Sequence, residues 1–89
     1  MDSLDFKTIG QNIKKRRKSL GITQEFIAEQ LDVNPSHISN IECGRANPSL
    51  TALVKIANIL HCSVDFFISG DPSKTEHNFY IRFNFDPLA

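Results

Sequence analysis

Hydrophobic residues recur at helical spacing along the first 70 residues of the chain, in five separate stretches. The pattern predicts helices over residues 6–19, 24–31, 35–43, 50–60 and 64–69. The residues placed to cap their N-terminal ends are Asp5, Thr23, Asn34, Ser49 and Ser63. Glycines at positions 21, 44 and 70 follow three of the stretches, as expected where helices end. The predicted fold class is therefore all-α, a five-helix bundle.

The apolar stripes of these helices predict the core, because such a stripe nearly always faces the inside of a bundle. The predicted core contains Phe6, Ile9, Ile13, Leu20, Ile27, Leu31, Val33, Ile38, Ile41, Leu50, Leu53, Ile56, Ala57, Leu60, Val64, Phe67 and Ile68. A chain of 89 residues buries only about 60% of the surface that its unfolded form exposes. A second copy of the chain would therefore add useful stability.

Helices 24–31 and 35–43 are separated by three residues, which is the spacing of a helix-turn-helix unit. Asp32 ends the first of them, and Asp tolerates the left-handed conformation that so tight a turn demands. Asn34 is a favourable N-cap for the second, and Pro35 suits its first position because the missing N–H costs nothing there.

The outward face of helix 35–43 indicates what the unit binds. A helical wheel turns Ile38, Ile41 and Glu42 inward or to the edge. The residues left outside are Ser36, Asn40 and Cys43, flanked by Ser39 and His37. Their side chains are short, uncharged and able to form hydrogen bonds, which is typical of a helix that enters the major groove of DNA. A merely solvated face usually carries Glu and Lys, so we favour DNA contact.

The net charge of zero argues against indiscriminate binding of polyanions, but the charge is unevenly distributed. Six of the ten basic residues lie between positions 7 and 18, and no acidic residue lies among them. Such a run is usually a solvated helix face, yet it also fits one end of a phosphate-facing surface. The run alone does not decide between these two interpretations.

Residues 20–70 resemble the phage-repressor-like, Cro/xenobiotic-response-element type of helix-turn-helix regulator. The most specific matches, all in family order and spacing, are Thr23-Gln24, Ala28, Ile38-Ser39, Ile41-Glu42, Gly44, Pro48-Ser49-Leu50 and Ile56-Ala57. The resemblance implies a repressor-like bundle that binds double-stranded DNA to regulate transcription, with the third helix reading bases.

Carried over by position, the resemblance also implies roles for residues around the third helix. Base edges would be contacted by Pro35, Ser36, Ser39 and Asn40, and the DNA backbone by Gln24, Asn34, His37, Cys43, Arg45 and Asn47. A structural ion pair would join Arg17 to Glu42, whose charge near DNA would otherwise be repulsive.

Three residues depart from the family pattern. Asp32 stands where the family prefers Gly, and Pro35 where some members carry a base-reading amide. Arg16 occupies a usually apolar place in the first helix, and we expect its head group to reach solvent.

The chain changes in composition after Gly70, and we divide it into a DNA-binding domain at 1–70 and a linker with a strand-like tail at 71–89. Residues 78–85 alternate with period two, which predicts a β-strand. Its apolar face carries Phe79, Ile81, Phe83 and Phe85.

A lone strand is unstable, so the tail is expected to pack on the bundle, to pair with the tail of a second subunit, or to be disordered. We favour antiparallel pairing in a homodimer, because two recognition helices about 34 Å apart suit a repressor. If the tail is not the interface, Phe66 and Phe67 of helix 64–69 are the better candidates.

The main alternative function is a protein-binding regulator, such as an antitoxin or an antagonist of another transcription factor. A protein-binding face needs large apolar anchors, which the tail carries and the outward face of helix 35–43 lacks. An enzyme is not expected, because the chain has no Gly-rich phosphate loop and no metal-ligand spacing. We likewise expect no cofactor, no metal and no small-molecule ligand.

The two cysteines, Cys43 and Cys62, cannot form a disulfide framework and are expected to be free thiols of a cytoplasmic protein. We expect no signal peptide and no membrane span, because no apolar run approaches roughly 18 residues. The operator sequence, the regulated genes and any effector are not indicated by the sequence.

Overall fold

The computed structural model describes residues 5–71, which fold into helices joined by short turns. The helices are α1 (Phe6–Ser19), α2 (Gln24–Leu31), α3 (Pro35–Glu42), α4 (Leu50–Ile59) and α5 (Val64–Ser69). The predicted all-α class is confirmed for this part of the chain. α3 and α4 each end just before the predicted last residue, because Cys43 and Leu60 are their C-caps. The predicted strand at 78–85 lies outside the described residues.

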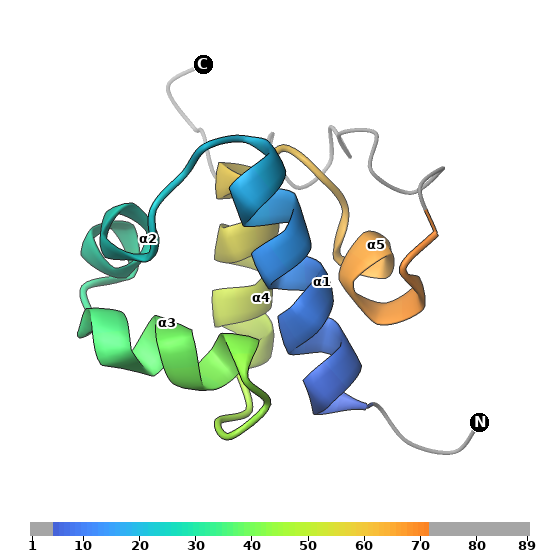
Figure 1. Cartoon of the computed structure of the whole chain (residues 1–89), viewed down its shortest axis with the longest axis horizontal. Helices are drawn as coiled ribbons and strands as arrows, with labels where there is room; N and C mark the ends of the chain where they lie inside the picture. Colours follow the sequence, from blue (N-terminus) through green and yellow to red (C-terminus); the bar gives the residue numbers. More distant parts are fainter. Residues whose placement is uncertain (1–4, 72–89) are drawn as a thin grey trace.

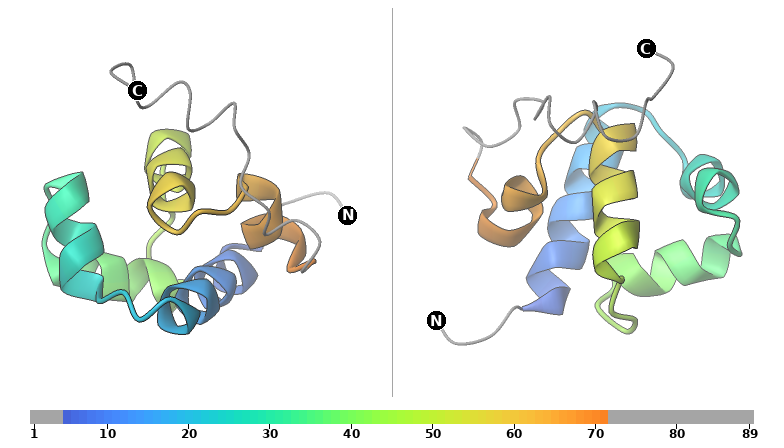
Figure 2. Two further views of the ribbon diagram at one scale, coloured as in Figure 1. Left: turned by 90° about the horizontal axis from the view of Figure 1, so that it is seen from above. Right: turned by 180° about the vertical axis from the view of Figure 1, so that it is seen from behind.

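α1 lies between the other elements, with α3 packed against one side of it and α5 against the other (Figure 1). α2 packs against α3 and α4, and α4 also contacts α5. Seen from above, α2 and α3 lie at one end of the molecule and α5 at the opposite end (Figure 2). The helix-turn-helix pair therefore packs on α1 through α3 and on α4 through α2.

Side-chain oxygens cap four of the helices as the sequence predicts. Thr23, Ser49 and Ser63 each accept a hydrogen bond from the backbone N–H three residues further on, at 3.0–3.3 Å. Asp5 accepts from both the backbone N–H and the hydroxyl of Thr8. The hydroxyl bond is the main reason why the pKa of Asp5 lies below its usual value.

The N-terminus of α3 differs from this pattern. Asn34 occupies the N-cap position, but its side chain forms no capping hydrogen bond. The N–H of His37, which a capping side chain would bind, donates instead to the Asn34 carbonyl at 2.9 Å. Pro35 has no N–H to satisfy, so the first turn of α3 needs less from its cap.

The hydrophobic core is formed by buried residues from all five helices and from the turn between α4 and α5. They are Ile9, Ile13, Ile27, Ala28, Ile38, Ile41, Leu53, Ile56, Ala57, Leu60, Cys62, Phe66 and Phe67. The residues predicted to be in the core but 36–73% exposed are Leu20, Val33, Leu50 and Ile68. Each lies at a helix end or in the turn beyond it, where a side chain has packing neighbours on one side only. Helical spacing alone does not show where an apolar stripe stops being covered.

The two phenylalanines of α5 belong to the core and not to the surface. Phe66 and Phe67 are both buried, and their rings meet edge to face with centroids 6.0 Å apart. The Asn12 side-chain amide donates to the Phe67 carbonyl at 2.9 Å, which fixes α5 against α1. The alternative dimer interface predicted through these two rings is therefore wrong.

Arg16 is half-buried, and its head group, which the sequence analysis expects at the solvent, also binds two backbone carbonyls. Its Nε donates to the Leu60 carbonyl at 2.9 Å and its Nη2 to the His61 carbonyl at 3.1 Å. These carbonyls lie at the C-terminal end of α4, where a helix leaves acceptors unpaired and favours a positive charge. Arg16 therefore joins α1 to the end of α4.

α1 approaches α3 closely at Gly10, which is buried. A methyl group at this position would overlap the carbonyl oxygen of Ile41 and lie 2.8 Å from that of Glu42. Both obstacles are backbone atoms, which cannot turn aside as a side chain can. The contact between the two helices therefore requires a residue without a side chain.

Gly10→Ala is expected to lower the melting temperature, although alanine usually stabilises a helix by about 1 kcal/mol relative to glycine. Forced separation of α1 and α3 should outweigh that gain and cost about 1–3 kcal/mol. Gly21→Ala is the conformational control, because a Cβ there has nothing within 4 Å and meets only the cost of its φ of +70°. A melting temperature raised by Gly10→Ala would contradict the close approach.

Candidate functional site

The turn between α2 and α3 sets the angle at which α3 is presented. Asp32 adopts φ 59° and ψ 48°, so the predicted left-handed turn is confirmed. The next N–H, of Val33, donates to the Ala28 carbonyl at 3.0 Å and closes the end of α2. Ala28 is buried where the two helices meet, which explains its small side chain. The turn is therefore fixed by local bonds and by close packing.

The faces of α3 divide as the helical wheel predicts. Ile38, Ile41 and Glu42 are buried. The outward positions are exposed at Pro35, Ser36, His37 and Cys43 and half-buried at Ser39 and Asn40. No acidic side chain and no large aliphatic side chain interrupts this surface of α3, which we call the α3 face. It can offer hydrogen bonds to a ligand without electrostatic repulsion of an anion.

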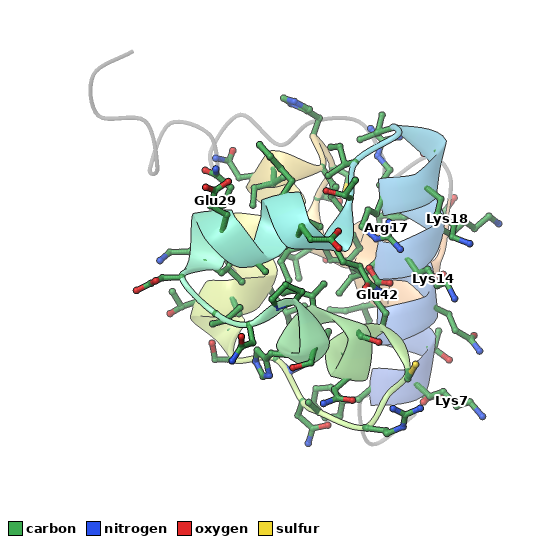
Figure 3. All side chains as sticks on the ribbon, turned by 60° about the vertical axis from the view of Figure 1, so that its left-hand side comes forward. Lys7, Lys14, Arg17, Lys18, Glu29 and Glu42 are labelled. Atoms are coloured by element: carbon green, nitrogen blue, oxygen red, sulfur yellow. The ribbon has the colours of Figure 1, made fainter. Side chains whose placement is uncertain are left out.

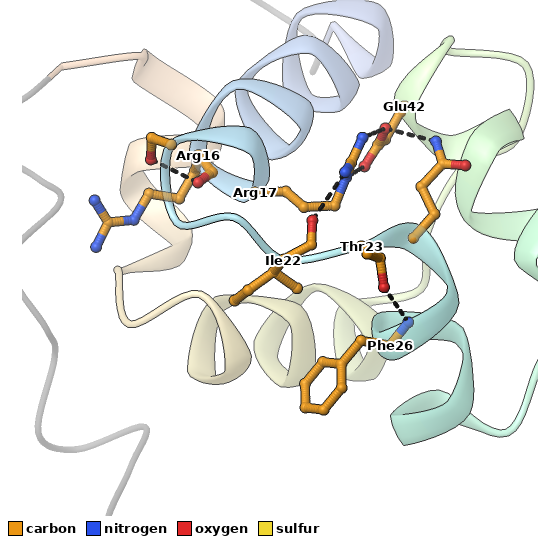
Figure 4. Close-up of polar contacts among 8 residues, drawn as sticks. Arg16, Arg17, Ile22, Thr23, Phe26 and Glu42 are labelled. Atoms are coloured by element: carbon orange, nitrogen blue, oxygen red, sulfur yellow. Dashed lines mark hydrogen bonds and ion pairs between the residues drawn. The ribbon is translucent and has the colours of Figure 1, made fainter.

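Glu42, at the end of α3, forms a buried ion pair with Arg17 of α1 (Figure 4). Arg17 Nε donates to Glu42 Oε2 at 2.6 Å and Nη2 donates to Oε1 at 3.0 Å, so the contact is bidentate. Arg17 Nη1 donates to the Ile22 carbonyl at 2.9 Å. The structure thus brings together the two residues that the family resemblance pairs.

Gln24 adds a third helix to this contact. Its Nε2 donates to Glu42 Oε1 at 2.9 Å, a bond that the sequence analysis does not predict. The expected role of Gln24 is contact with the DNA backbone, for which its amide keeps a second N–H. The Glu42 carboxylate therefore holds the start of α2 in place.

The loop after α3 folds back over the end of the helix. Gly44 adopts φ 79°, and its N–H donates to the Ile41 carbonyl at 3.1 Å. The N–H of Arg45 donates to the Asn40 carbonyl at 2.8 Å, which completes a Schellman-type C-cap. Arg45 Nη1 also donates to Asn40 Oδ1 at 3.2 Å. Arg45 and Asn47 are both exposed, in positions next to the α3 face.

The basic run of α1 is divided between two tasks. Arg16 and Arg17 bind protein groups, as described above. Lys7, Lys14 and Lys18 point away from the bundle along the outer side of α1 (Figure 3). The two arginines therefore stabilise the fold, and the three lysines leave positive charge on the surface. The spacing of the basic residues did not predict this difference.

Metal-binding groups, cysteines and membrane-spanning helices can be checked directly in the described residues. Within residues 5–71, no group of three His, Cys, Asp or Glu side chains is placed to hold a metal ion. Cys43 is exposed and Cys62 is buried, and both are free. Burial raises the pKa of the Cys62 thiol to about 11. No helix in this range is long and apolar enough to cross a membrane.

Comparison with known proteins finds a family model and several regulators that are similar to this chain. A helix-turn-helix family model matches residues 13–67. The SPbeta prophage-derived uncharacterized HTH-type transcriptional regulator YonR of Bacillus subtilis is 38% identical over 61 residues, covering 68% of this chain and 56% of that protein. The immunity repressor protein of Bacillus phage phi105 is 38% identical over 64 residues, covering 72% of this chain and 44% of the repressor.

A solved structure shows the same arrangement of the chain. The restriction-modification controller protein C.AhdI from Aeromonas hydrophila superposes with a TM-score of 0.65 at 27% identity, covering 71% of this chain and 96% of that one. The matches to curated relatives are partial, because this chain spans about half the length of the first few of them.

Glu42→Ala is expected to destabilise the protein by about 3–5 kcal/mol, because it leaves the Arg17 guanidinium buried without its partner. The matched control is Glu25→Ala in α2, whose exposed carboxylate should contribute less than about 0.5 kcal/mol. Urea unfolding of both variants measures the difference. Equal stabilities would show that the Arg17–Glu42 pair does not hold the helices together.

Proposed function

The chain belongs to the helix-turn-helix family, and on that premise we propose that it is a sequence-specific DNA-binding transcriptional regulator that acts as a repressor. The family is one of DNA-binding regulators, and the similar proteins include a phage immunity repressor. In the proposed complex, α3 enters the major groove of double-stranded DNA. The observation that carries this proposal is the α3 face, a row of short hydrogen-bonding side chains without negative charge.

Base contacts are assigned to the four residues that line the α3 face along one side, Pro35, Ser36, Ser39 and Asn40. Contacts to the DNA backbone are assigned to the residues around it, Gln24, Asn34, His37, Cys43, Arg45 and Asn47. Lys7 lies against the loop at Gly44 and adds positive charge at the edge of this surface. The pairing of Glu42 with Arg17 supports the assignment, because it neutralises a carboxylate at the end of α3.

We further propose that the protein binds DNA as a homodimer through its tail, with residues 1–70 as the DNA-binding domain and 71–89 as linker and dimerisation element. The residues of the interface would be Phe79, Ile81, Phe83 and Phe85, which alternate in the sequence. Phe66 and Phe67, the alternative candidates in the sequence, are buried in the core. Two α3 helices in a dimer would contact successive turns of the major groove.

Asn40→Ala is expected to weaken binding to the preferred duplex by about 1–3 kcal/mol and to relax the preference at one base pair. An amide can bond both N6 and N7 of adenine, and alanine can bond neither. Selection of bound sequences from random duplexes identifies the preferred site, and titration of wild type and variant measures the loss. Unchanged base preference in the variant would remove Asn40 from the base contacts.

Truncation after Gly70 is expected to convert a dimer into a monomer without unfolding the domain. The buried core of the described residues lies between Ile9 and Phe67, so the truncated chain keeps all of it. Mass in solution, measured by light scattering for both lengths of chain, tests the proposal. The same oligomeric state for the two lengths would show that the tail is not the dimer interface.

A further inference from the structure

Three hydrogen bonds join the loop after α3 to a single residue of the α3 face, Asn40. The backbone N–H groups of Arg45 and Ala46 donate to the Asn40 carbonyl at 2.8 and 3.1 Å. The third bond joins the side chains, from Arg45 Nη1 to Asn40 Oδ1 at 3.2 Å. A residue assigned to the DNA backbone therefore contacts a residue assigned to a base.

The C-cap of α3 explains why these two side chains meet. In a Schellman motif the second residue beyond the C-cap lies next to the third residue from the helix end, and this contact is usually apolar. Here those positions hold Arg45 and Asn40. Gly44 also fixes the loop, because a Cβ at this position would lie 2.9 Å from the Lys7 Cα. The loop therefore has little room to carry Arg45 away from Asn40.

The chemistry of the contact fixes which way the Asn40 amide faces. A guanidinium group has donors only, so the amide must turn its oxygen toward Arg45 and its NH2 group elsewhere. Adenine is recognised by an amide whose N–H donates to N7 while its oxygen accepts from N6. The second lone pair of Oδ1 is available for N6, so the contact with Arg45 is compatible with adenine recognition. The same contact disfavours the flipped amide, in which the NH2 group would face Arg45.

We propose that Arg45 is a positioning residue for base recognition: it holds the Asn40 amide in one orientation and thereby sets the base preference at the pair that Asn40 contacts. The inference rests on the proposed function and extends the role of Arg45 beyond a backbone contact. The bond to Asn40 uses one of the five N–H donors of the guanidinium, and the others remain available for a phosphate.

The test measures discrimination, the ratio of Kd for a duplex substituted at the Asn40 base pair to Kd for the preferred duplex, at one salt concentration. Loss of a phosphate contact weakens both duplexes equally and cancels in this ratio. Bidentate recognition gives a ratio of about 5- to 150-fold. Arg45→Met is expected to lower it at least about threefold, and to leave the ratios at other base pairs unchanged.

Lys7→Met is the matched control, because it removes one exposed positive charge that lies against the same loop. It should weaken both duplexes by the same factor and leave the ratio unchanged. In an Asn40→Ala background, Arg45→Met should no longer affect the ratio. If it still does, Arg45 reads the base by itself and the proposal is wrong.

Two further outcomes separate this inference from the proposed function. If wild type is selective and Arg45→Met leaves the ratio unchanged, the positioning role is wrong while DNA recognition stands. If wild type shows no base preference at any position, the proposed function fails and the inference fails with it. In the DNA-free protein, Arg45→Met should shift the side-chain amide resonances of Asn40 and Lys7→Met should not; unshifted resonances would contradict the contact itself.

Discussion

The carboxylate of Glu42 connects the first three helices of the chain. Arg17 of α1 and Gln24 of α2 both donate to it, and Arg17 also binds the carbonyl of Ile22 between those helices. A buried charge is costly unless every lone pair and proton has a partner, so this arrangement tolerates few alternatives. The planar fork of the arginine adds a geometric restriction. The position of α3 relative to the rest of the bundle depends on this set of bonds.

The same bonds determine the charge that the molecule presents. Neutralisation of Glu42 removes negative charge beside the end of α3, at the expense of an arginine that would otherwise be free to bind anions. Arg16 is also engaged, by the carbonyls of Leu60 and His61 just beyond α4. Lysines, which hold their ammonium groups in water, are left along the exposed side of α1. A run of like charges in the sequence thus becomes two arginines that organise helices and a row of lysines that face solvent.

The boundaries of the helices were predictable because they depend on residues only a few positions apart. Thr23, Ser49 and Ser63 each satisfy an N–H three residues away, and Asp32 closes a turn by its own conformation. The outward and inward faces of α3 follow from helical periodicity in the same way. Family resemblance, not local pattern, is what pointed to Arg17 and Glu42 as partners.

The contacts that were not predictable join residues that only the folded chain brings near each other. The carbonyl partners of Arg16 lie some 45 positions away, and Gln24 meets Glu42 across two helices. Leu50 and Leu53 belong to one stripe, yet only Leu53 is covered, because the core ends between them. The side chains of Asn40 and Arg45 are only five positions apart, but their bond needs the left-handed turn at Gly44 to form.

Gly10 lets the backbone of α1 meet the backbone of α3 directly, with no side chain of the outer surface involved. Within the described residues, Ser36, His37 and Cys43 lie outside the core that anchors α3. Substitutions at such exposed positions usually change stability by less than about 0.5 kcal/mol. Under the proposed function, exchange of the outer residues of α3 would change which DNA is bound and leave the scaffold beneath unchanged. Recognition and folding would then depend on different residues of the same helix.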